Sequence, residues 1–141
     1  MQLRLSPCPF QHMDLIMLKT LLISALTFAA SQAFALNITP YSAEALKAAQ
    51  AAGKPVALHF HATWCSTCRT QERAFLGMKG APALKDVTLF VVDHDKEKAL
   101  KQALKVRSQS TLIVYKGSQQ TAFVAGETDP AALQASLKSA L

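Results

Sequence analysis

The sequence predicts one α/β domain with a central mixed β-sheet and helices on both faces. Helical and strand-like segments alternate along residues 36–141 in the order α, β, α, β, α, β, β, α. This order is typical of parallel central strands joined by right-handed crossovers, with an antiparallel hairpin at one edge. A Cys65-Ser66-Thr67-Cys68 motif stands where an apolar strand passes into a helix. The 141 residues, half of them hydrophobic, allow one small core and no second domain.

The first 35 residues are predicted to be an amino-terminal extension and a signal peptide. Lys19 precedes an apolar stretch (21–30), and Ala33-Phe34-Ala35 has the Ala-x-Ala form of a cleavage site. We expect export to the periplasm, cleavage after Ala35 and a mature domain of residues 36–141. An uncleaved amino-terminal anchor is the alternative, although the apolar stretch is short for a membrane span. Cleavage also removes Cys8, which leaves the mature chain with one close cysteine pair.

The elements within residues 36–141 follow from apolar periodicity and from helix and turn signals. The run Val87 to Val92 is almost entirely apolar, so we expect this strand to be buried on both faces. The predicted elements are an edge strand within 36–41, a helix over 43–52, a strand over 55–60, a helix over 66–76, a turn over 81–85, a strand over 87–92, a helix over 97–104, strands over 111–115 and 121–125, and a helix over 131–141.

Several boundaries carry a specific signal. Ser42 and Asp129 are suited to cap helices, and Pro130 stands at the first position of the last helix. Gly53 stops the first helix, because glycine is favoured just past a helix end. Lys116-Gly117-Ser118 favours a tight antiparallel hairpin between the last two strands.

The cysteine pair carries most of the chemical information. A cysteine in the first turn of a helix faces unpaired backbone N–H groups and the positive end of the helix dipole, which stabilise a thiolate. The fixed charge of Arg69 acts in the same direction. Two intervening residues allow one helical turn to bring the sulfurs together, so that an attacked partner disulfide can be resolved within the motif.

Three interpretations of the pair compete: a catalytic dithiol, a structural disulfide and half of a zinc site. A structural zinc site usually needs four protein ligands, and the sequence has no second Cys-x-x-Cys or His pair at matching spacing. A disulfide across two residues would constrain little of the unfolded chain. Thiol–disulfide exchange is therefore favoured, with Cys65 as the nucleophile and Cys68 as the resolving thiol.

The residues around this motif resemble the thioredoxin family. The matching features are the strand before the motif, the Ala-Thr-Trp-Cys-x-x-Cys-Arg core (62–69) and the run Thr111 to Gly117. Within the family the chain looks most like the carboxy-terminal periplasmic domain of the thiol:disulfide interchange protein DsbD. That similarity rests on Gly53 to Val56, Glu72 and Phe75, and the whole resemblance covers residues 41–140.

This resemblance implies a thioredoxin-like fold and activity as a thiol:disulfide oxidoreductase. The substrates it implies are protein disulfides, and the direction is reduction, with electrons from a membrane thiol donor. It implies no cofactor. By the same resemblance, Cys65 is the exposed thiol of the pair.

The resemblance also suggests roles for residues around the cysteines. Trp64 shapes the site surface, with ordinary packing as the alternative. His59 stands where the family has a buried acidic residue, and we hypothesise that it accepts the proton of Cys68; the alternative is a packed histidine without a role. Glu72 lies one helical turn beyond Cys68 and modulates it, or is simply a solvated carboxylate. His61 occupies a position where the family often has an aromatic residue; the alternative is a partly buried spacer without a role.

Ser110 is the clearest departure from the family pattern. The family almost always has a cis-proline directly before the strand that begins here at Thr111. A cis bond without proline costs about 2.5 to 4 kcal/mol. We therefore expect a trans Gln109–Ser110 bond and a substrate groove altered at these two residues.

The missing proline ring also motivates an alternative function. Cysteines that are not screened by proline are more open to metal. Cys65 and Cys68, with His61 or His59 as a further ligand, could then bind a soft cation such as Cu(I) in a periplasmic copper-binding or delivery protein.

The net charge of +6 is spread over scattered lysines without interleaved aromatic residues. This pattern indicates a solvated surface and not a nucleic-acid interface. We expect a monomer that binds no nucleic acid.

Overall fold

A computed structural model describes residues 36–141, and the predicted signal peptide and its cleavage site lie almost entirely outside the described residues. The predicted α/β class is confirmed by a five-stranded sheet in the order β1-β3-β2-β4-β5. The elements are β1 (Asn37–Pro40), α2 (Ala43–Ala51), β2 (Pro55–His61), α3 (Ser66–Gly77), the 3₁₀ turn η1 (Pro82–Leu84), β3 (Thr88–Asp93), α4 (Lys98–Ala103), β4 (Thr111–Lys116), β5 (Gln119–Ala125) and α5 (Pro130–Lys138).

The sheet is mixed in a way that corrects one prediction. Strands β1, β3 and β2 are parallel, but β4 runs antiparallel to β2, and β5 is antiparallel to β4. The prediction had placed β4 among the parallel central strands. Residues 94–110 connect β3 to β4 and contain only the six-residue helix α4. Ser110 N donates to Phe60 O at 2.9 Å, and Thr111 pairs with Phe60. Strand β4 therefore starts at the end of the sheet where β2 and β3 finish, and it runs back from there.

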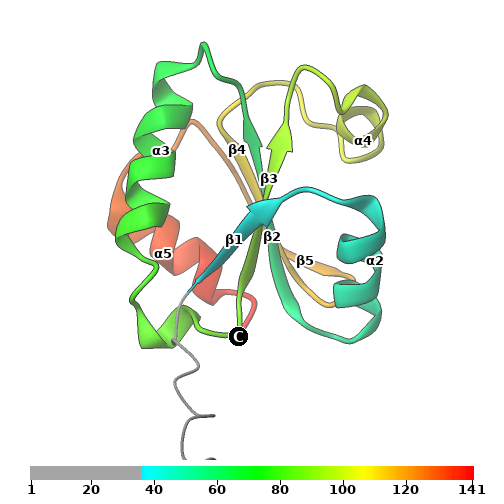
Figure 1. The fold of residues 1–141 in the computed structure, drawn as a ribbon, viewed down its shortest axis with the longest axis vertical. Helices are drawn as coiled ribbons and strands as arrows, with labels where there is room; N and C mark the ends of the chain where they lie inside the picture. Colours follow the sequence, from blue (N-terminus) through cyan, green and yellow to red (C-terminus); the bar gives the residue numbers. More distant parts are fainter. Residues whose placement is uncertain (1–35) are drawn as a thin grey trace, which may run out of the picture. The chain divides into compact units, whose positions relative to one another are not determined.

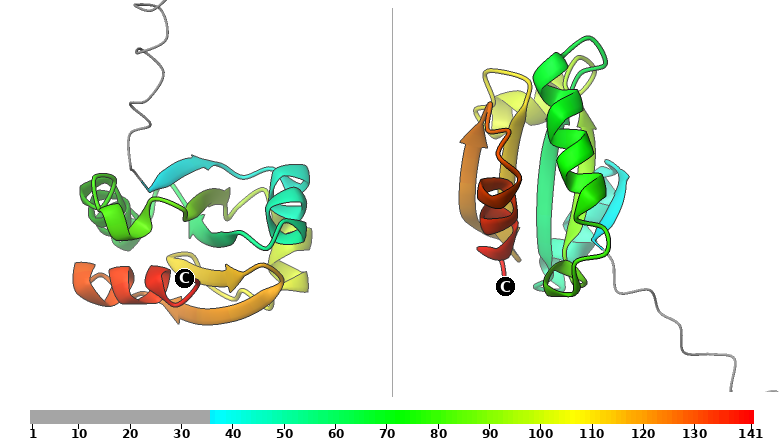
Figure 2. Two further views of the ribbon diagram at one scale, coloured as in Figure 1. Left: turned by 90° about the horizontal axis from the view of Figure 1, so that it is seen from below. Right: turned by 90° about the vertical axis from the view of Figure 1, so that its left-hand side faces the viewer.

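Helices cover both faces of the sheet, as predicted. Helices α3 and α5 lie on one face and α2 and α4 on the other (Figures 1 and 2). Alternation along β2 divides the core accordingly. Ala57 packs with the side chains of α3 and α5, whereas Val56, Leu58 and Phe60 pack on the α2 and α4 side. His59, on the same face as Ala57, is thereby turned toward α3.

The helix signals are confirmed at both capped ends. Ser42 Oγ accepts a hydrogen bond from the Ala45 N–H at 3.3 Å, and Asp129 Oδ2 accepts one from the Ala132 N–H at 2.8 Å. The last helix ends at Lys138, three residues earlier than predicted. Leu141, inside the predicted helix, therefore lies beyond its end and is half exposed.

None of the helices in residues 36–141 combines the length and the apolar character that a membrane crossing requires.

Candidate active site at the start of α3

Cys65 and Cys68 form a disulfide at the amino-terminal end of α3, with their Cα atoms 5.3 Å apart. Cys65 is the N-cap residue of this helix, and its Sγ accepts a hydrogen bond from the Cys68 N–H at 3.0 Å. A tight turn from Ala62 O to Cys65 N carries the chain from β2 into this cap. The sequence prediction of a thiol facing unpaired helix N–H groups is therefore matched by a direct contact.

Both sulfurs are more buried than the resemblance implies. Cys65 is 5% exposed and Cys68 is completely buried. Cys65 is slightly more accessible than Cys68, but it is not the exposed residue that the resemblance implies. The side chain of Ser110 contributes to this burial, because it lies directly against both cysteines.

The Ser110 hydroxyl lies close to both sulfurs. Its Oγ is 3.1 Å from Cys65 Sγ and 3.2 Å from Cys68 Sγ. The described residues contain no cis peptide bond, so the Gln109–Ser110 bond is trans, as expected. Ser110 has a φ of +61°, a left-handed conformation that proline, with φ held near −65°, cannot adopt. The backbone here is therefore built for a residue other than proline.

Gln71 is the site residue that the sequence prediction missed. It is completely buried in α3. Its Oε1 lies 2.9 Å from His59 Nε2, and its Nε2 donates to Ser110 O at 3.0 Å and to Glu127 O at 2.7 Å. Gln71 thus joins β2, α3, the start of β4 and the loop before α5. A signal existed, because Cys68, Gln71 and Phe75 follow the i, i+3, i+7 spacing of a buried helix face.

His59 is buried and uncharged near neutral pH. Burial lowers its pKa from 6.5 to about 4; the hydrogen bond with Gln71 opposes this shift and the nearby His61 adds to it. Because the Gln71 amide nitrogen donates to two carbonyl oxygens, its oxygen is the acceptor and His59 Nε2 carries the proton. The ring also packs edge-on against Phe75, with centroids 5.1 Å apart.

His61 and Glu72 pair with each other and not with the cysteines. His61 Nε2 lies 3.8 Å from Glu72 Oε2, which is close enough for an ion pair but too long for a hydrogen bond. The same nitrogen is buried and has no hydrogen-bond partner. Glu72 is exposed on α3. Among the described residues, neither side chain has a hydrogen bond or ion pair to Cys65 or Cys68.

Trp64 and Arg69 lie on the surface around the cysteine loop. Trp64 is 61% exposed, so it is not ordinary core packing, and its indole N–H donates to Asp95 Oδ2 at 2.8 Å. This bond is the main cause of the lowered pKa of Asp95. Arg69 Nη1 donates to Thr63 O at 3.0 Å. The Trp64 contact attaches the loop before Cys65 to Asp95, and the Arg69 contact attaches the same loop to α3. Arg69 itself stays exposed to solvent.

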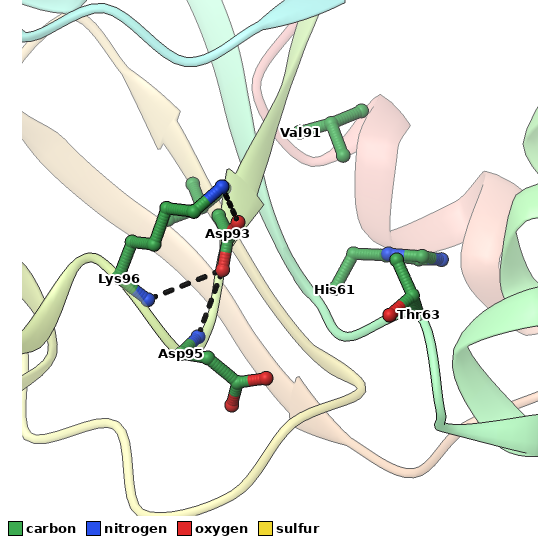
Figure 3. Close-up of a pocket in the computed structure, with 7 residues that line it drawn as sticks. His61, Thr63, Val91, Asp93, Asp95 and Lys96 are labelled. Atoms are coloured by element: carbon green, nitrogen blue, oxygen red, sulfur yellow. Dashed lines mark hydrogen bonds and ion pairs between the residues drawn. The ribbon is translucent and has the colours of Figure 1, made fainter.

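A surface hollow of about 420 Å³ lies beside this loop. Figure 3 shows the Asp93 carboxylate bonded to Lys96 and to the backbone N–H of Asp95, with His61 and Thr63 across the hollow. The Lys96 contact is the largest cause of the lowered pKa of Asp93. The hollow is lined by His61, Thr63, Val91, Val92, Asp93, Asp95 and Lys96.

The alternative of a soft-metal site is not favoured by this geometry. In residues 36–141, no three side chains of His, Cys, Asp or Glu are grouped so that they could hold a metal ion. His61, the predicted third ligand, pairs with Glu72. Among the described residues, the cysteines are therefore without the third ligand that was predicted for Cu(I).

Comparisons with known proteins agree with the fold and with the cysteine site. The family profile described as Thioredoxin matches residues 37–139. Thioredoxin-2 of Saccharomyces cerevisiae is 34% identical over 99 residues, which are 70% of this chain and 92% of the yeast protein. The solved structure of Trxlp from Edwardsiella tarda has a TM-score of 0.69 at 40% identity and covers 72% of this chain and 98% of that one.

The thiol:disulfide interchange protein DsbD of Ralstonia nicotianae is 42% identical over 62 residues. These are 43% of this chain but only 10% of that protein, so the expected similarity to DsbD holds for a short segment. The match to the family profile, with the Cys65–Cys68 disulfide at the start of α3, makes the protein a thiol:disulfide oxidoreductase. The chain belongs to the thioredoxin family.

Proposed function

We propose that the protein is an exported oxidoreductase that reduces disulfides in partner proteins through Cys65 and Cys68. The observation that carries this proposal is the placement of the pair. Cys65 caps α3 and its sulfur accepts the Cys68 N–H at 3.0 Å, an arrangement that stabilises a thiolate at Cys65 more than one at Cys68.

The exchange takes two steps. The Cys65 thiolate attacks one sulfur of a partner disulfide, so that a mixed disulfide forms, the partner's S–S bond breaks and one partner thiolate leaves. Cys68, as thiolate, then attacks Cys65 Sγ. The Cys65–Cys68 disulfide forms, the mixed disulfide breaks and the second partner thiolate leaves. The partner gains two electrons, the protein loses two, and the two partner thiolates take up protons from Cys68 and solvent.

The direction and the electron donor are inferred from the segment shared with DsbD, a protein named for thiol:disulfide interchange. A protein that reduces disulfides must itself be reduced after each turnover. We propose a membrane thiol protein as that donor, because an exported domain is separated from cytoplasmic reductants.

Export is proposed from the signal-like sequence of residues 17–35 alone. Expression of the full chain in a Gram-negative host, followed by fractionation and amino-terminal sequencing, tests it. Export predicts periplasmic protein that begins at Leu36. Protein that keeps its first residues and stays in the cytoplasm would contradict it.

Two measurements test the chemistry. A titration against glutathione or dithiothreitol gives the reduction potential of the cysteine pair. A value near about −270 mV, the level of thioredoxin, supports reduction, whereas one near about −120 mV supports disulfide donation.

Cys68→Ser should trap mixed disulfides with partner proteins, because the second step is lost. Cys65→Ser is the matched control and should trap none; equal trapping by both variants would contradict the assignment of the nucleophile.

A further inference from the structure

The hydroxyl group of Ser110 is poised between the two reacting sulfurs. Its oxygen is almost equidistant from them, at 3.1 and 3.2 Å. The other polar contacts of the sulfurs are to backbone: Cys65 Sγ accepts the Cys68 N–H, and Cys68 Sγ lies 4.0 Å from Phe60 O. Within residues 36–141, Ser110 is therefore the one side chain that hydrogen-bonds either cysteine, apart from the cysteines themselves.

We propose that Ser110 is a catalytic residue whose hydroxyl donates a hydrogen bond to the Cys65 thiolate in the reduced protein. A hydroxyl has one proton to donate and two lone pairs, and the proton can rotate to suit its neighbours. Ser110 can therefore donate to the Cys65 thiolate and accept from the Cys68 thiol at the same time. This arrangement favours the ionised form at the sulfur that attacks and keeps the proton on the sulfur that waits.

The surroundings hold the hydroxyl in this position. Ser110 N donates to Phe60 O at 2.9 Å, and Ser110 O accepts from Gly126 N at 2.9 Å and from Gln71 Nε2 at 3.0 Å. These contacts come from β2, from the end of β5 and from α3, and they retain the left-handed φ of +61°. A donor that is fixed before the reaction needs no reorganisation when charge develops on sulfur.

This role of Ser110 rests on the proposed exchange reaction and predicts how the hydroxyl changes the reduction potential of the cysteine pair. A hydrogen bond to a thiolate is stronger than one to the neutral sulfurs of a disulfide, because the acceptor is charged. Ser110 therefore stabilises the reduced protein more than the oxidised protein. Loss of the hydroxyl should make the pair more reducing and Cys65 less ionised.

The experiment compares Ser110→Ala with Ser108→Ala in the full chain. Ser108 lies exposed in the same loop, and its side chain has no hydrogen bond to either sulfur. After reduction, the rate of Cys65 alkylation by iodoacetamide is measured against pH, and the equilibrium with glutathione is measured in parallel. In Ser110→Ala we expect the alkylation midpoint to rise by about 1 to 2 pH units. The equilibrium constant for oxidation by glutathione disulfide should rise about tenfold; Ser108→Ala should match the wild type in both.

A second variant separates the hydroxyl from the backbone strain. Ser110→Gly also removes the hydroxyl but adopts positive φ freely, so it should fold even if Ser110→Ala does not. It should show the same upward shift of the alkylation midpoint. An unchanged midpoint in a folded variant at this position overturns the role of Ser110. Failure of the wild type to reduce insulin would instead overturn the proposed function, because the alkylation titration requires no turnover.

Discussion

His59 shows how burial changes the chemistry of a site residue. It stands where the family has an acidic group, yet its side chain is uncharged near neutral pH because burial lowers its pKa to about 4. A carboxylate would raise the pKa of a neighbouring thiol through like-charge repulsion, and a neutral imidazole does not. The proton-acceptor role for Cys68 stays a prediction. With a pKa of about 4, the ring is a weak base for a thiol, whose ordinary pKa is about 8.5, and its hydrogen bond is to Gln71.

The buried histidine should make the fold sensitive to acid. Because the pKa of His59 is about 4 in the folded protein and 6.5 in the reference state, the unfolded chain binds the proton more readily. The stability it contributes is present above pH 6.5 and is lost as the pH falls toward 4. We expect the wild type to lose about 3 kcal/mol more between pH 7 and pH 4 than His59→Gln, measured by urea unfolding of the oxidised proteins.

Gln102→Leu is the control for this prediction, since Gln102 lies exposed on α4 and its side chain does not titrate. Its pH dependence should follow the wild type. If the stability of the wild type and of His59→Gln falls equally with pH, His59 binds a proton equally easily in the folded and the unfolded chain, and the prediction is wrong.

The proton-acceptor role has its own test in the variant His59→Ala. An unchanged rate and pH profile of disulfide reduction in this variant would remove the role.

Gln71 should be the most sensitive polar residue of the site. Gln71→Leu keeps a similar volume but removes the hydrogen bonds to His59, Ser110 and Glu127. Because buried polar groups then lose their partners, we expect the free energy of unfolding to fall by about 2 to 4 kcal/mol. Gln102→Leu, on the exposed face of α4, should change it by less than about 0.5 kcal/mol. Similar losses in both variants would contradict the network.

At the scale of elements, the β4–β5 hairpin depends on Gly117. This residue has a φ of +57°, and a Cβ atom there would lie 3.3 Å from the Cα of Gly53. Gly117→Ala should therefore lower the free energy of unfolding by about 1 to 2 kcal/mol, measured by chemical denaturation. Gly80→Ala is the control, because an added Cβ meets nothing within 4 Å there. A neutral effect at Gly117 would mean that the hairpin and Gly53 move apart without cost.

At the scale of the whole molecule, Leu36 anchors the start of the described domain. Its side chain is completely buried in the core under α3 and α5, and its N–H donates to Lys79 O at 3.1 Å. A chain of residues 37–141 should be less stable than one of residues 36–141 by about 2 to 3 kcal/mol, because one buried leucine is lost. Thermal unfolding of the two chains checks this, and equal stability would contradict it.

Local features of the sequence were sufficient to predict the elements and the reactive pair. Ser42 and Asp129 cap helices because capping involves residues only three positions apart. Cys65 and Cys68 lie at the start of α3 for the same reason, since one helical turn places them together. Alternation along β2 likewise turns His59 and His61 away from Leu58 and Phe60, because successive residues of a strand face opposite sides of the sheet.

Only the tertiary structure decided the hydrogen bonds around that pair. Ser110 is 42 residues beyond Cys68, and Gln71 is 56 residues before Glu127, so no local pattern relates them. The antiparallel direction of β4 also depends on where the connection through α4 ends, which is beside the carboxyl end of β2. Sequence by itself determined the sulfur chemistry, because that is set within one helical turn. The hydroxyl beside the sulfurs and the uncharged state of His59 were decided by packing between distant strands and helices, because burial and hydrogen bonding depend on neighbours in space.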